Sequence, residues 1–384
     1  MVSRRVRVAG SAILAAVVAS CVLVAPAGAT DPASTTAAAK AVARLVTQQQ
    51  ADGGFEVAGF PGFETPDAVL AIAEGAQTGP TWSTAEALAA VQALHYGGSG
   101  GLTPLDALDA WAMSGINAGE ASKLLLLVVR PLGLDPTDFG SSHTNLATKV
   151  YPSGCASPPD LTKTFFYEKM YAGFGGEILC GAPDAAILTA IRTAQRPEGG
   201  WNFNGSTAAV DPSDPFDPNM PDVDTTAIAV EVLVAGGAAW NDPALVKALG
   251  FLAAGYQPTG AFQSFGSDDP NATAVGMLAI AAAGFDPDSS CWRDTAAPAS
   301  AGTPYALPAA WIRSQQQSDG HIASPNDGSE PNTFASAQSV EALLLRDLPM
   351  ARATGAPTCI VTAPEVVSAP PASDPVELVP RFTG

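Results

Sequence analysis

Two aspartates separated by one residue, Asp222 and Asp224, stand directly before an apolar segment and are followed by Thr225 and Thr226. A carboxyl group that is held neutral in a dry, apolar pocket can act as a general acid. The same residue types also form an ordinary helix N-cap, because their oxygens accept hydrogen bonds from the first turn. The sequence therefore leaves two roles open for this pair, proton donor or helix cap.

The loop before this pair is dense in oxygen ligands, which include Asp211, Asp214 and Asp217. Calcium binds such oxygens, but no EF-hand spacing is present, and a solvated acidic loop is the competing interpretation. The three histidines have no cysteine at a zinc-ligand spacing, and no phosphate-binding loop or G-x-S-x-G elbow occurs. We expect no cofactor, with calcium as the open alternative.

Aromatic residues near the same loop could line a binding site for a hydrophobic ligand. These candidates are Trp201, Phe203, Phe216 and Phe262. Together with Asp211, Asp214 and Asp217 they are the predicted binding residues. The alternative is that these side chains belong to the core.

A recurring glutamine–glycine–aromatic phrase separates pairs of helical segments, as in Gln195, Gly199 and Trp201. Weaker copies are Gln50, Gly53 and Phe55; Gln257, Gly260 and Phe262; and Gln317 and Gly320. The helical pattern predicts six hairpins, most of them formed by two helical segments. The first pairs 30–50 with a helix that begins at 65, the second pairs 83–94 with 103–130, and the third is the irregular segment 135–181. The last three pair 183–195 with 224–234, 243–254 with 271–283, and 307–317 with 333–345. Since one hairpin cannot bury its own apolar face, we predict six hairpins that close into a ring of inner and outer helices.

The phrase resembles the QW repeat of squalene cyclases and protein prenyltransferase β-subunits, whose fold is an α/α toroid. In those families the glutamine caps the next helix. Residues 221–227 also resemble the D-x-D-D-T-A motif of squalene–hopene cyclases, in which the middle aspartate protonates an alkene. By this resemblance Asp224 matches the acid and Asp222 the first aspartate, whereas Thr225 stands in place of the last one.

The ends of the chain differ from its middle. Basic residues, an apolar run and a small-residue cleavage site predict a secretion signal over 1–29, with acylation of Cys21 as an alternative. The toroid is expected over 30–360, and the Pro- and Ala-rich segment 361–384 is expected to be disordered. The formal net charge of -19 argues against binding to nucleic acid or anionic lipids.

Four cysteines follow the signal, and an even number in an exported protein suggests disulfides. Three pairings are possible for four cysteines. We predict nearest with nearest, which gives Cys155–Cys180 and Cys291–Cys359.

The sequence favours a secreted, non-catalytic protein that binds a hydrophobic small molecule or partner at the mouth of the ring. It is not expected to span a membrane, and an association with the cell envelope stays open. The first alternative is a class II terpenoid cyclase-like enzyme, which would need Asp224 buried in an apolar cavity. The second is a structural or cell-surface protein.

Overall fold

The computed structural model describes residues 31–357, apart from 56–61, 162–163, 212, 215–216, 297–303, 326–332 and 347–350. The predicted signal 1–29 with Cys21, the tail 361–384, Cys359 and Phe216 lie outside the described residues. In the part that is described, no helix is long and apolar enough to cross a membrane.

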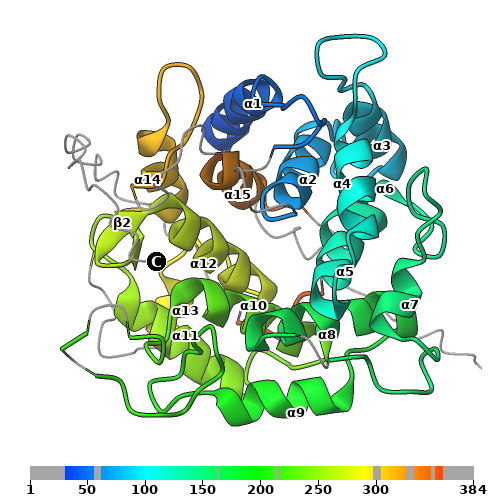
Figure 1. Ribbon diagram of the computed structural model, residues 1–384. Helices are drawn as coiled ribbons and strands as arrows, with labels where there is room; N and C mark the ends of the chain where they lie inside the picture. The colour runs from blue at the N-terminus through cyan, green and yellow to red at the C-terminus, as the bar shows by residue number, and fades with distance from the viewer. Residues whose placement is uncertain are drawn as a thin grey trace, which may run out of the picture.

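The helices form two concentric layers (Figure 1). The inner layer contains α2 (Thr65–Gly75), α5 (Ala118–Leu124) with its π-helical continuation η1 (Leu125–Val129), α8 (Phe166–Cys180), α10 (Val223–Ala235), α12 (Pro270–Ala282) and α15 (Thr333–Leu344). Each inner helix contacts the next in this order, and α15 returns to contact α2. The prediction of an all-α fold is therefore confirmed.

The outer layer covers this inner ring (Figure 1). It contains α1 (Pro32–Val46), α3 (Thr84–Gln92), α4 (Pro104–Met113), α6 (Arg130–Leu132), α7 (Leu146–Val150), α9 (Ala185–Ala194), α11 (Pro243–Gly255), α13 (Cys291–Ala296) and α14 (Pro308–Gln315). A short antiparallel pair, β1 (Phe262–Ser264) and β2 (Ser267–Asp269), leads into α12.

The two layers differ in how their helices are patterned. Outer helix α9 buries Ile187, Ile191 and Ala194 on one side, as an amphipathic surface helix does. Inner helix α2 buries every residue from Thr65 to Glu74. A helix that is apolar on almost all sides can only be stable when it is surrounded by protein, which is the position the ring gives it.

The turns between outer and inner helices share one hydrogen-bond pattern. The side-chain nitrogen of Gln195 donates to the carbonyl oxygen of Gly199 at 2.8 Å and to that of Ala244, in the first turn of α11, at 2.8 Å. The glutamine thus closes its own turn and ties it to the neighbouring outer helix.

In two other turns the glutamine with this role is not the one predicted. Gln49, rather than Gln50, donates to the carbonyl oxygens of Gly53 at 3.0 Å and Leu102 at 3.3 Å. Like the side chain of Gln195, it bonds to the carbonyl oxygen of the residue four positions later in the sequence. The predicted register was therefore wrong by one residue at Gln50.

The same error applies to the last turn. Gln316, rather than Gln317, donates to the carbonyl oxygens of Gly320 at 2.9 Å and Ala37 at 2.8 Å. In the third turn Tyr256 takes the place predicted for Gln257, and its hydroxyl group donates to the carbonyl oxygen of Ala306 at 2.8 Å. A hydroxyl donor can replace the amide because both only have to reach a backbone carbonyl on the next outer segment.

The turn glycine is required by close packing. Gly199 has a φ of 101°, and a Cβ atom there would lie 2.2 Å from the carbonyl oxygen of Lys247 on α11. A larger residue would therefore both strain the backbone and push the neighbouring outer helix away.

The first and last hairpins are bonded directly to each other. Besides the bond from Gln316 to Ala37 on α1, Arg313 pairs with Asp31 at 2.9 Å and Arg44 pairs with Asp319 at 3.2 Å. The helices α1 and α15 also pack together. These contacts join the ends of the array.

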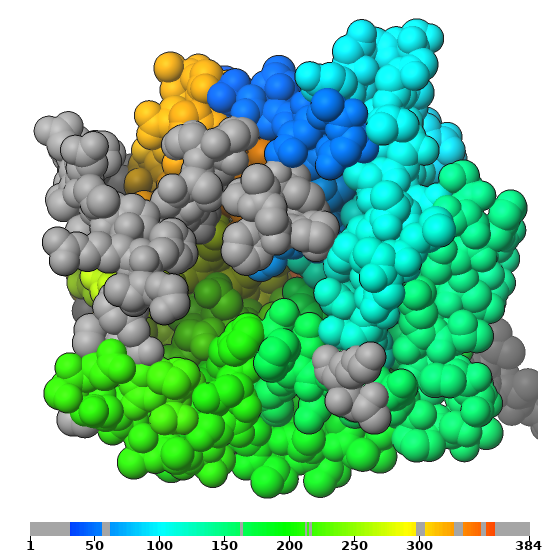
Figure 2. All heavy atoms as spheres, viewed as in Figure 1, coloured from blue at the N-terminus to red at the C-terminus, as the bar shows by residue number. Residues whose placement is uncertain are grey.

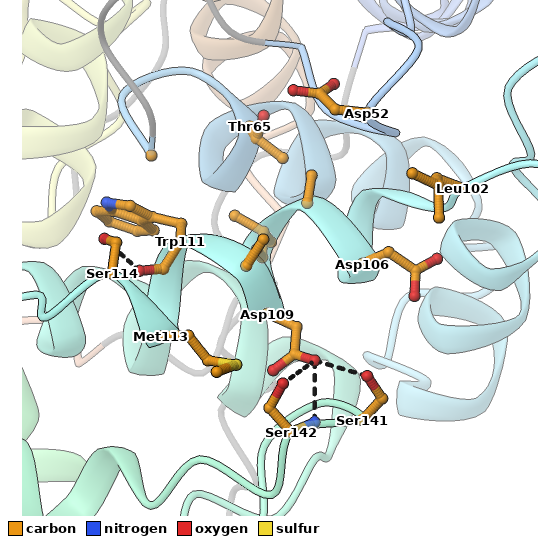
Figure 3. Close-up of a pocket in the computed structure, with 14 residues that line it drawn as sticks. Asp52, Thr65, Leu102, Asp106, Asp109, Trp111, Met113, Ser114, Ser141 and Ser142 are labelled. Atoms are coloured by element: carbon orange, nitrogen blue, oxygen red, sulfur yellow. Dashed lines mark hydrogen bonds between the residues drawn. The ribbon is translucent and has the colours of Figure 1, made fainter.

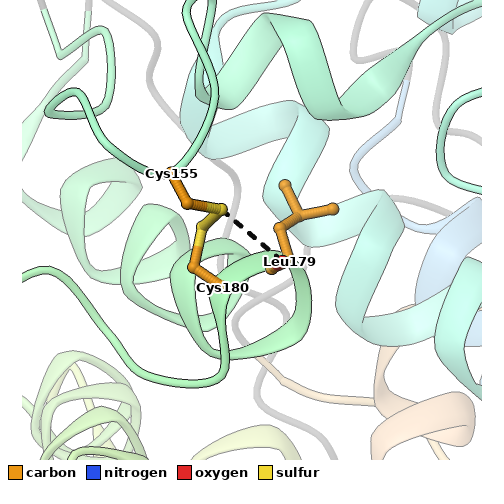
Figure 4. Close-up of a disulfide and its surroundings, with 3 residues drawn as sticks. All are labelled: Cys155, Leu179 and Cys180. Atoms are coloured by element: carbon orange, nitrogen blue, oxygen red, sulfur yellow. Dashed lines mark hydrogen bonds between the residues drawn. A yellow bond between two sulfur atoms is a disulfide. The ribbon is translucent and has the colours of Figure 1, made fainter.

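The predicted disulfide between Cys155 and Cys180 is confirmed (Figure 4). It connects the segment after α7 to the end of α8, at a sequence separation of 25. Because Cys359 lies outside the described residues, the pairing Cys291–Cys359 stays a prediction.

Candidate functional site

The two predicted acids have different surroundings at the start of α10. Asp222 is the N-cap, and its carboxylate accepts hydrogen bonds from the backbone N–H of Thr225 at 2.6 Å and from its hydroxyl group at 2.9 Å. Burial raises the pKa of Asp222 to about 6. Asp224 lies in the first turn and is exposed, so it lacks the burial that we required of an alkene-protonating acid.

Two of the predicted binding aromatics belong to the core instead. Trp201 and Phe262 are both 0% exposed. The indole N–H of Trp201 donates to the carbonyl oxygen of Ile191 at 2.6 Å, and Phe262 packs on Tyr256. The prediction that they line a mouth was wrong, because the turn points its aromatic residue between the layers.

Phe203 does lie at the surface. It is 52% exposed and stacks on Tyr167 of α8, with ring centroids 4.4 Å apart. It is the only one of the predicted aromatics that the described residues place at the surface.

The predicted acidic loop uses its carboxylates to hold its own shape. Asp211 accepts from the backbone and hydroxyl of Ser213 at 2.9 and 2.7 Å, which lowers its pKa. Asp217 accepts from the backbone N–H groups of Asp211 and Asn219, which lower its pKa, whereas Asp214 is exposed. No three His, Cys, Asp or Glu side chains among the described residues are arranged to hold a metal ion.

A repeated hydroxyl group provides a common reference point on four inner helices. The hydroxyl oxygen of Thr226 accepts from the backbone N–H of Trp201 at 3.0 Å. The corresponding bonds run from Phe55 to Thr65 at 2.8 Å, from Phe262 to Thr273 at 2.9 Å and from Ile322 to Ser336 at 3.0 Å. Residues at equal distances from these hydroxyls therefore occupy equivalent places in the ring.

One face of α10 keeps contact with solvent although the rest of the helix is buried. Asp224 is exposed, and Ile228, Glu231 and Ala235 are partly exposed, whereas every other residue of the helix is buried. Their spacing places them on one side of an α-helix. This side must border an open space.

Other inner helices show the same pattern. Val275 and Leu278 are partly exposed on α12, as are Phe334 and Gln338 on α15. Val275 and Gln338 are equivalent to Ile228, each two residues after its reference hydroxyl. Figure 2 shows a hollow near the centre of the ring. We interpret the partly exposed faces of these inner helices as its lining.

Acidic residues occupy several of these inward positions. Glu231 and Glu341 each lie five residues after their reference hydroxyls, Thr226 and Ser336, where α2 and α12 have leucines. Asp67 and Glu74 lie on α2. We refer to Asp67, Glu74, Glu231 and Glu341 as the central acid cluster.

Burial dominates the electrostatics of this cluster. It raises the pKa of Glu231 to about 8 and that of Glu74 to about 8, the latter against the opposing charge of Arg346. The pKa of Glu341 is raised well above its ordinary value, first by burial and then by Glu74 and other acids. The carboxyl groups of Glu231 and Glu74 are therefore mainly protonated and neutral near pH 7.

Tyr171 connects the cluster to α8. Its pKa is raised well above the ordinary value by burial and by the charges of Asp67, Glu231 and Glu341. Acids from α2, α10 and α15 thus surround one tyrosine inside the ring.

The fourth acid is paired. The ammonium group of Lys123, on α5, lies 2.8 Å from Asp67 and donates to the carbonyl oxygen of Phe63 at 2.6 Å. The same ammonium is 5.3 and 5.9 Å from the ring centres of Phe63 and Phe334, which is cation–π distance. In contrast, both oxygens of Glu74 have no hydrogen-bond partner among the described residues.

Together these features give an apolar hollow with uncharged carboxyl groups and aromatic rings. Such groups can donate a proton or a hydrogen bond, and they can stabilise a positive charge that forms nearby. This cluster was not among the predicted site residues, although the sequence carries a signal for it. Glu74, Glu231 and Glu341 are each isolated acids in otherwise apolar helices, where an unexplained charge is costly.

A second cavity, of about 600 Å³, lies beside α4 (Figure 3). Its most buried acid is Asp109, which accepts from the hydroxyl of Ser141 at 2.8 Å and from the backbone and hydroxyl of Ser142 at 3.0 Å each. Asp109 thus fastens the loop 141–142 to α4, which is a structural role.

No protein-family model and no curated protein matches the sequence. Among solved structures, the chain is similar to the type II terpene cyclase MstE from Scytonema without ligand, with 16% identity, a TM-score of 0.49 and coverage of 82% of this chain and 98% of that one. A variant of MstE in complex with geranylgeranyl dihydroxybenzoate has 14% identity and a TM-score of 0.49, with coverage of 82% of this chain and 97% of that one. A protein from Actinoplanes has 16% identity and a TM-score of 0.43, with coverage of 82% of this chain and 98% of that one.

Proposed function

We propose that the protein is a class II terpenoid cyclase-like enzyme, which takes a hydrophobic polyene into the ring and starts its cyclisation by protonating an alkene. The observation that carries this proposal is the carboxyl group of Glu231, which is neutral near pH 7 and lies on the partly exposed, mainly apolar inner face of α10. The proposal replaces non-catalytic binding as the preferred function.

Each part of the hollow suits this chemistry. Ile228, Val275 and Leu278 offer an apolar surface for a hydrocarbon chain. Uncharged acids do not oppose the entry of such a chain. Once a proton has left, the carboxylate and the substrate cation attract each other strongly, because water is scarce inside the ring.

Aromatic rings add to the stabilisation of a cation. Tyr171 and Phe334 lie on inner helices, and both are partly exposed. The faces of such rings attract positive charge. The ring of helices would also exclude water, which would otherwise capture the cation early.

The proposal is tested by incubating the purified protein in D₂O with squalene, geranylgeraniol and geranylgeranyl dihydroxybenzoate, followed by mass spectrometry. We expect a cyclised product from at least one polyene, with one deuterium bound to carbon. Heat-denatured protein should give none. The absence of product from all three would count against the proposal.

Binding without catalysis is the second candidate function, and two observations favour it. Asp224, which matches the acid of the related motif, is exposed, and Thr225 replaces its neighbouring aspartate. In native mass spectrometry a pure binder would retain an unchanged hydrophobic ligand, whereas an enzyme would release a cyclised isomer.

We also propose that the protein acts outside the cytoplasm, on the basis of the signal-like segment 1–29. Fractionation of the native host and sequencing of the mature N-terminus test this. A mature chain that starts near residue 30 and occurs outside the cell would agree with it, and an intact chain in the cytoplasm would not.

A further inference from the structure

We infer that Glu231, deep inside the ring, is the proton donor of the proposed cyclisation, and that Asp224 at the mouth is not. This inference rests on the proposed function and assigns its central role to a residue outside the recognisable motif. Three features of the structure lead to it: depth, accessibility and the neighbours of the carboxyl group.

The first feature is depth. Asp224 and Glu231 lie on the same face of α10, seven residues apart. At 1.5 Å per residue, Glu231 lies about 10 Å further along the helix than the exposed Asp224. Asp224 is exposed, so it offers no dry environment, whereas Glu231 is only partly exposed.

The second feature is accessibility. Glu74 and Glu341 are 1% and 5% exposed, so protein atoms cover them almost completely. Glu231 is partly exposed and has no hydrogen-bond partner among the described residues. Of Glu74, Glu231 and Glu341, Glu231 is therefore the acid that a ligand in the hollow can contact. Its carboxyl group is then available to the ligand.

The third feature is the set of groups that face this carboxyl. Glu341 on α15, Asp67 on α2 and Tyr171 on α8 all interact with it or with its immediate neighbours electrostatically. Lys123 on α5 neutralises Asp67, and Glu74 lies beside Glu341. No cation among these groups is paired with Glu231, which agrees with a neutral resting state and a pKa raised to about 8.

The step is balanced as follows. The O–H bond of Glu231 breaks and a C–H bond forms at the terminal alkene, whose π electrons are used, so that a tertiary cation results. The next alkene then attacks this cation and forms a ring bond. The final cation loses a proton from a neighbouring carbon to the carboxylate of Glu231, which restores the acid, so the overall reaction is an isomerisation.

This position predicts how the substrate enters. The alkene end has to travel down the hollow to Glu231, and a polar head group would remain at the mouth. Polyenes whose chains are too short to bridge this depth should bind without reacting.

The test compares Glu231→Gln and Asp224→Asn with the wild type and with Glu198→Gln, an exposed control at the rim. We expect Glu231→Gln to lower turnover more than 100-fold while it still binds the polyene in native mass spectrometry. Asp224→Asn and Glu198→Gln should stay within a few-fold of the wild type. Thermal melting checks that each variant is folded.

The wild-type rate should also fall as the pH rises past about 8, because the neutral form of Glu231 is then lost. Full turnover by Glu231→Gln, or loss of turnover in Asp224→Asn with Glu231→Gln active, would overturn this inference and leave the proposed function in place. A wild type that converts none of the polyenes would overturn both.

Discussion

The turns at the edge of the ring and the inward faces of its helices follow opposite rules. At the turns, Gln49, Gln195 and Gln316 make the same pair of hydrogen bonds in hairpins far apart in sequence. On the inward faces, equivalent positions differ: Glu231 and Glu341 stand where other hairpins have leucine. The repeated turn hydrogen bonds thus build the ring. The inward-facing positions whose residue type differs between hairpins mark the place where its chemistry is expected.

The largest effect should come from the aromatic residue of a turn. Trp201→Ala should destabilise the protein by about 3–5 kcal/mol, because it empties a fully buried site and removes the bond to Ile191. Phe203→Ala, two residues away and exposed, should cost less than about 1 kcal/mol. Urea unfolding of both variants measures the difference, and equal losses would contradict the assignment of Trp201 to the core.

Hairpin three, in the segment 135–181, has a disulfide, whereas the hairpins with Gln49, Gln195 and Gln316 have the glutamine turn. Replacing Cys155 and Cys180 by serine should cost about 3 kcal/mol, because the unfolded chain loses a constraint over 25 residues. Thermal unfolding with and without reductant measures this. If the stability of the wild type in reductant did not fall toward that of the double variant, the disulfide would contribute little to stability.

An inward acid should affect stability in a pH-dependent way that no turn residue shares. The pKa of Glu231 is about 8 in the folded protein and about 4.5 when unfolded, so the folded state binds more protons between these values. Stability should therefore fall as the pH rises from 5 to 8. Glu231→Gln should remove on the order of 3 kcal/mol of this fall.

Denaturant unfolding at pH 5 and pH 8 tests this sign. Glu198→Gln serves as the exposed control and should follow the wild type at both pH values. A Glu231→Gln variant that loses as much stability as the wild type between pH 5 and 8 would show that this carboxyl does not titrate in a buried site.

The smallest effect tests the register of the turns. Gln316→Ala should cost about 1–2 kcal/mol, because it leaves the carbonyl oxygens of Gly320 and Ala37 without this donor. Among the described residues, the side chain of the neighbouring Gln317 donates to the nearby carbonyl oxygen of Gln315, at 3.1 Å, and to no other segment, so Gln317→Ala should be nearly neutral. If Gln317→Ala lost more stability than Gln316→Ala, the result would support Gln317 as the turn glutamine, as the sequence predicted.

The helical hairpins could be predicted because local signals define them. Caps such as Ser83, Thr103 and Asn117 begin helices where the sequence places polar residues before apolar ones. The glutamine register could not be read in the same way. Runs of glutamine at 48–50 and 315–317 offer several donors, and only the three-dimensional turn selects one of them.

The central acid cluster depends on contacts between helices that are distant in sequence. Glu74 and Glu341 are brought together by the packing of α2 against α15, the first and last inner helices. No local pattern tells whether an acid on an apolar helix points inward or outward. The exposure of Asp224 and the burial of Trp201 were hidden for the same reason, since both depend on the layer that each side chain faces.

The bonds from Gln316 to Ala37 and from Arg313 to Asp31 have a consequence for how this chain can change over evolution. An open array of repeats can gain or lose a unit and keep its other interfaces, because its ends are free. Here each hairpin occupies a fixed share of a full circle, so deleting one would leave two unmatched edges facing a gap. Variation is therefore confined to loop length and side-chain identity, and the number of hairpins is fixed by geometry.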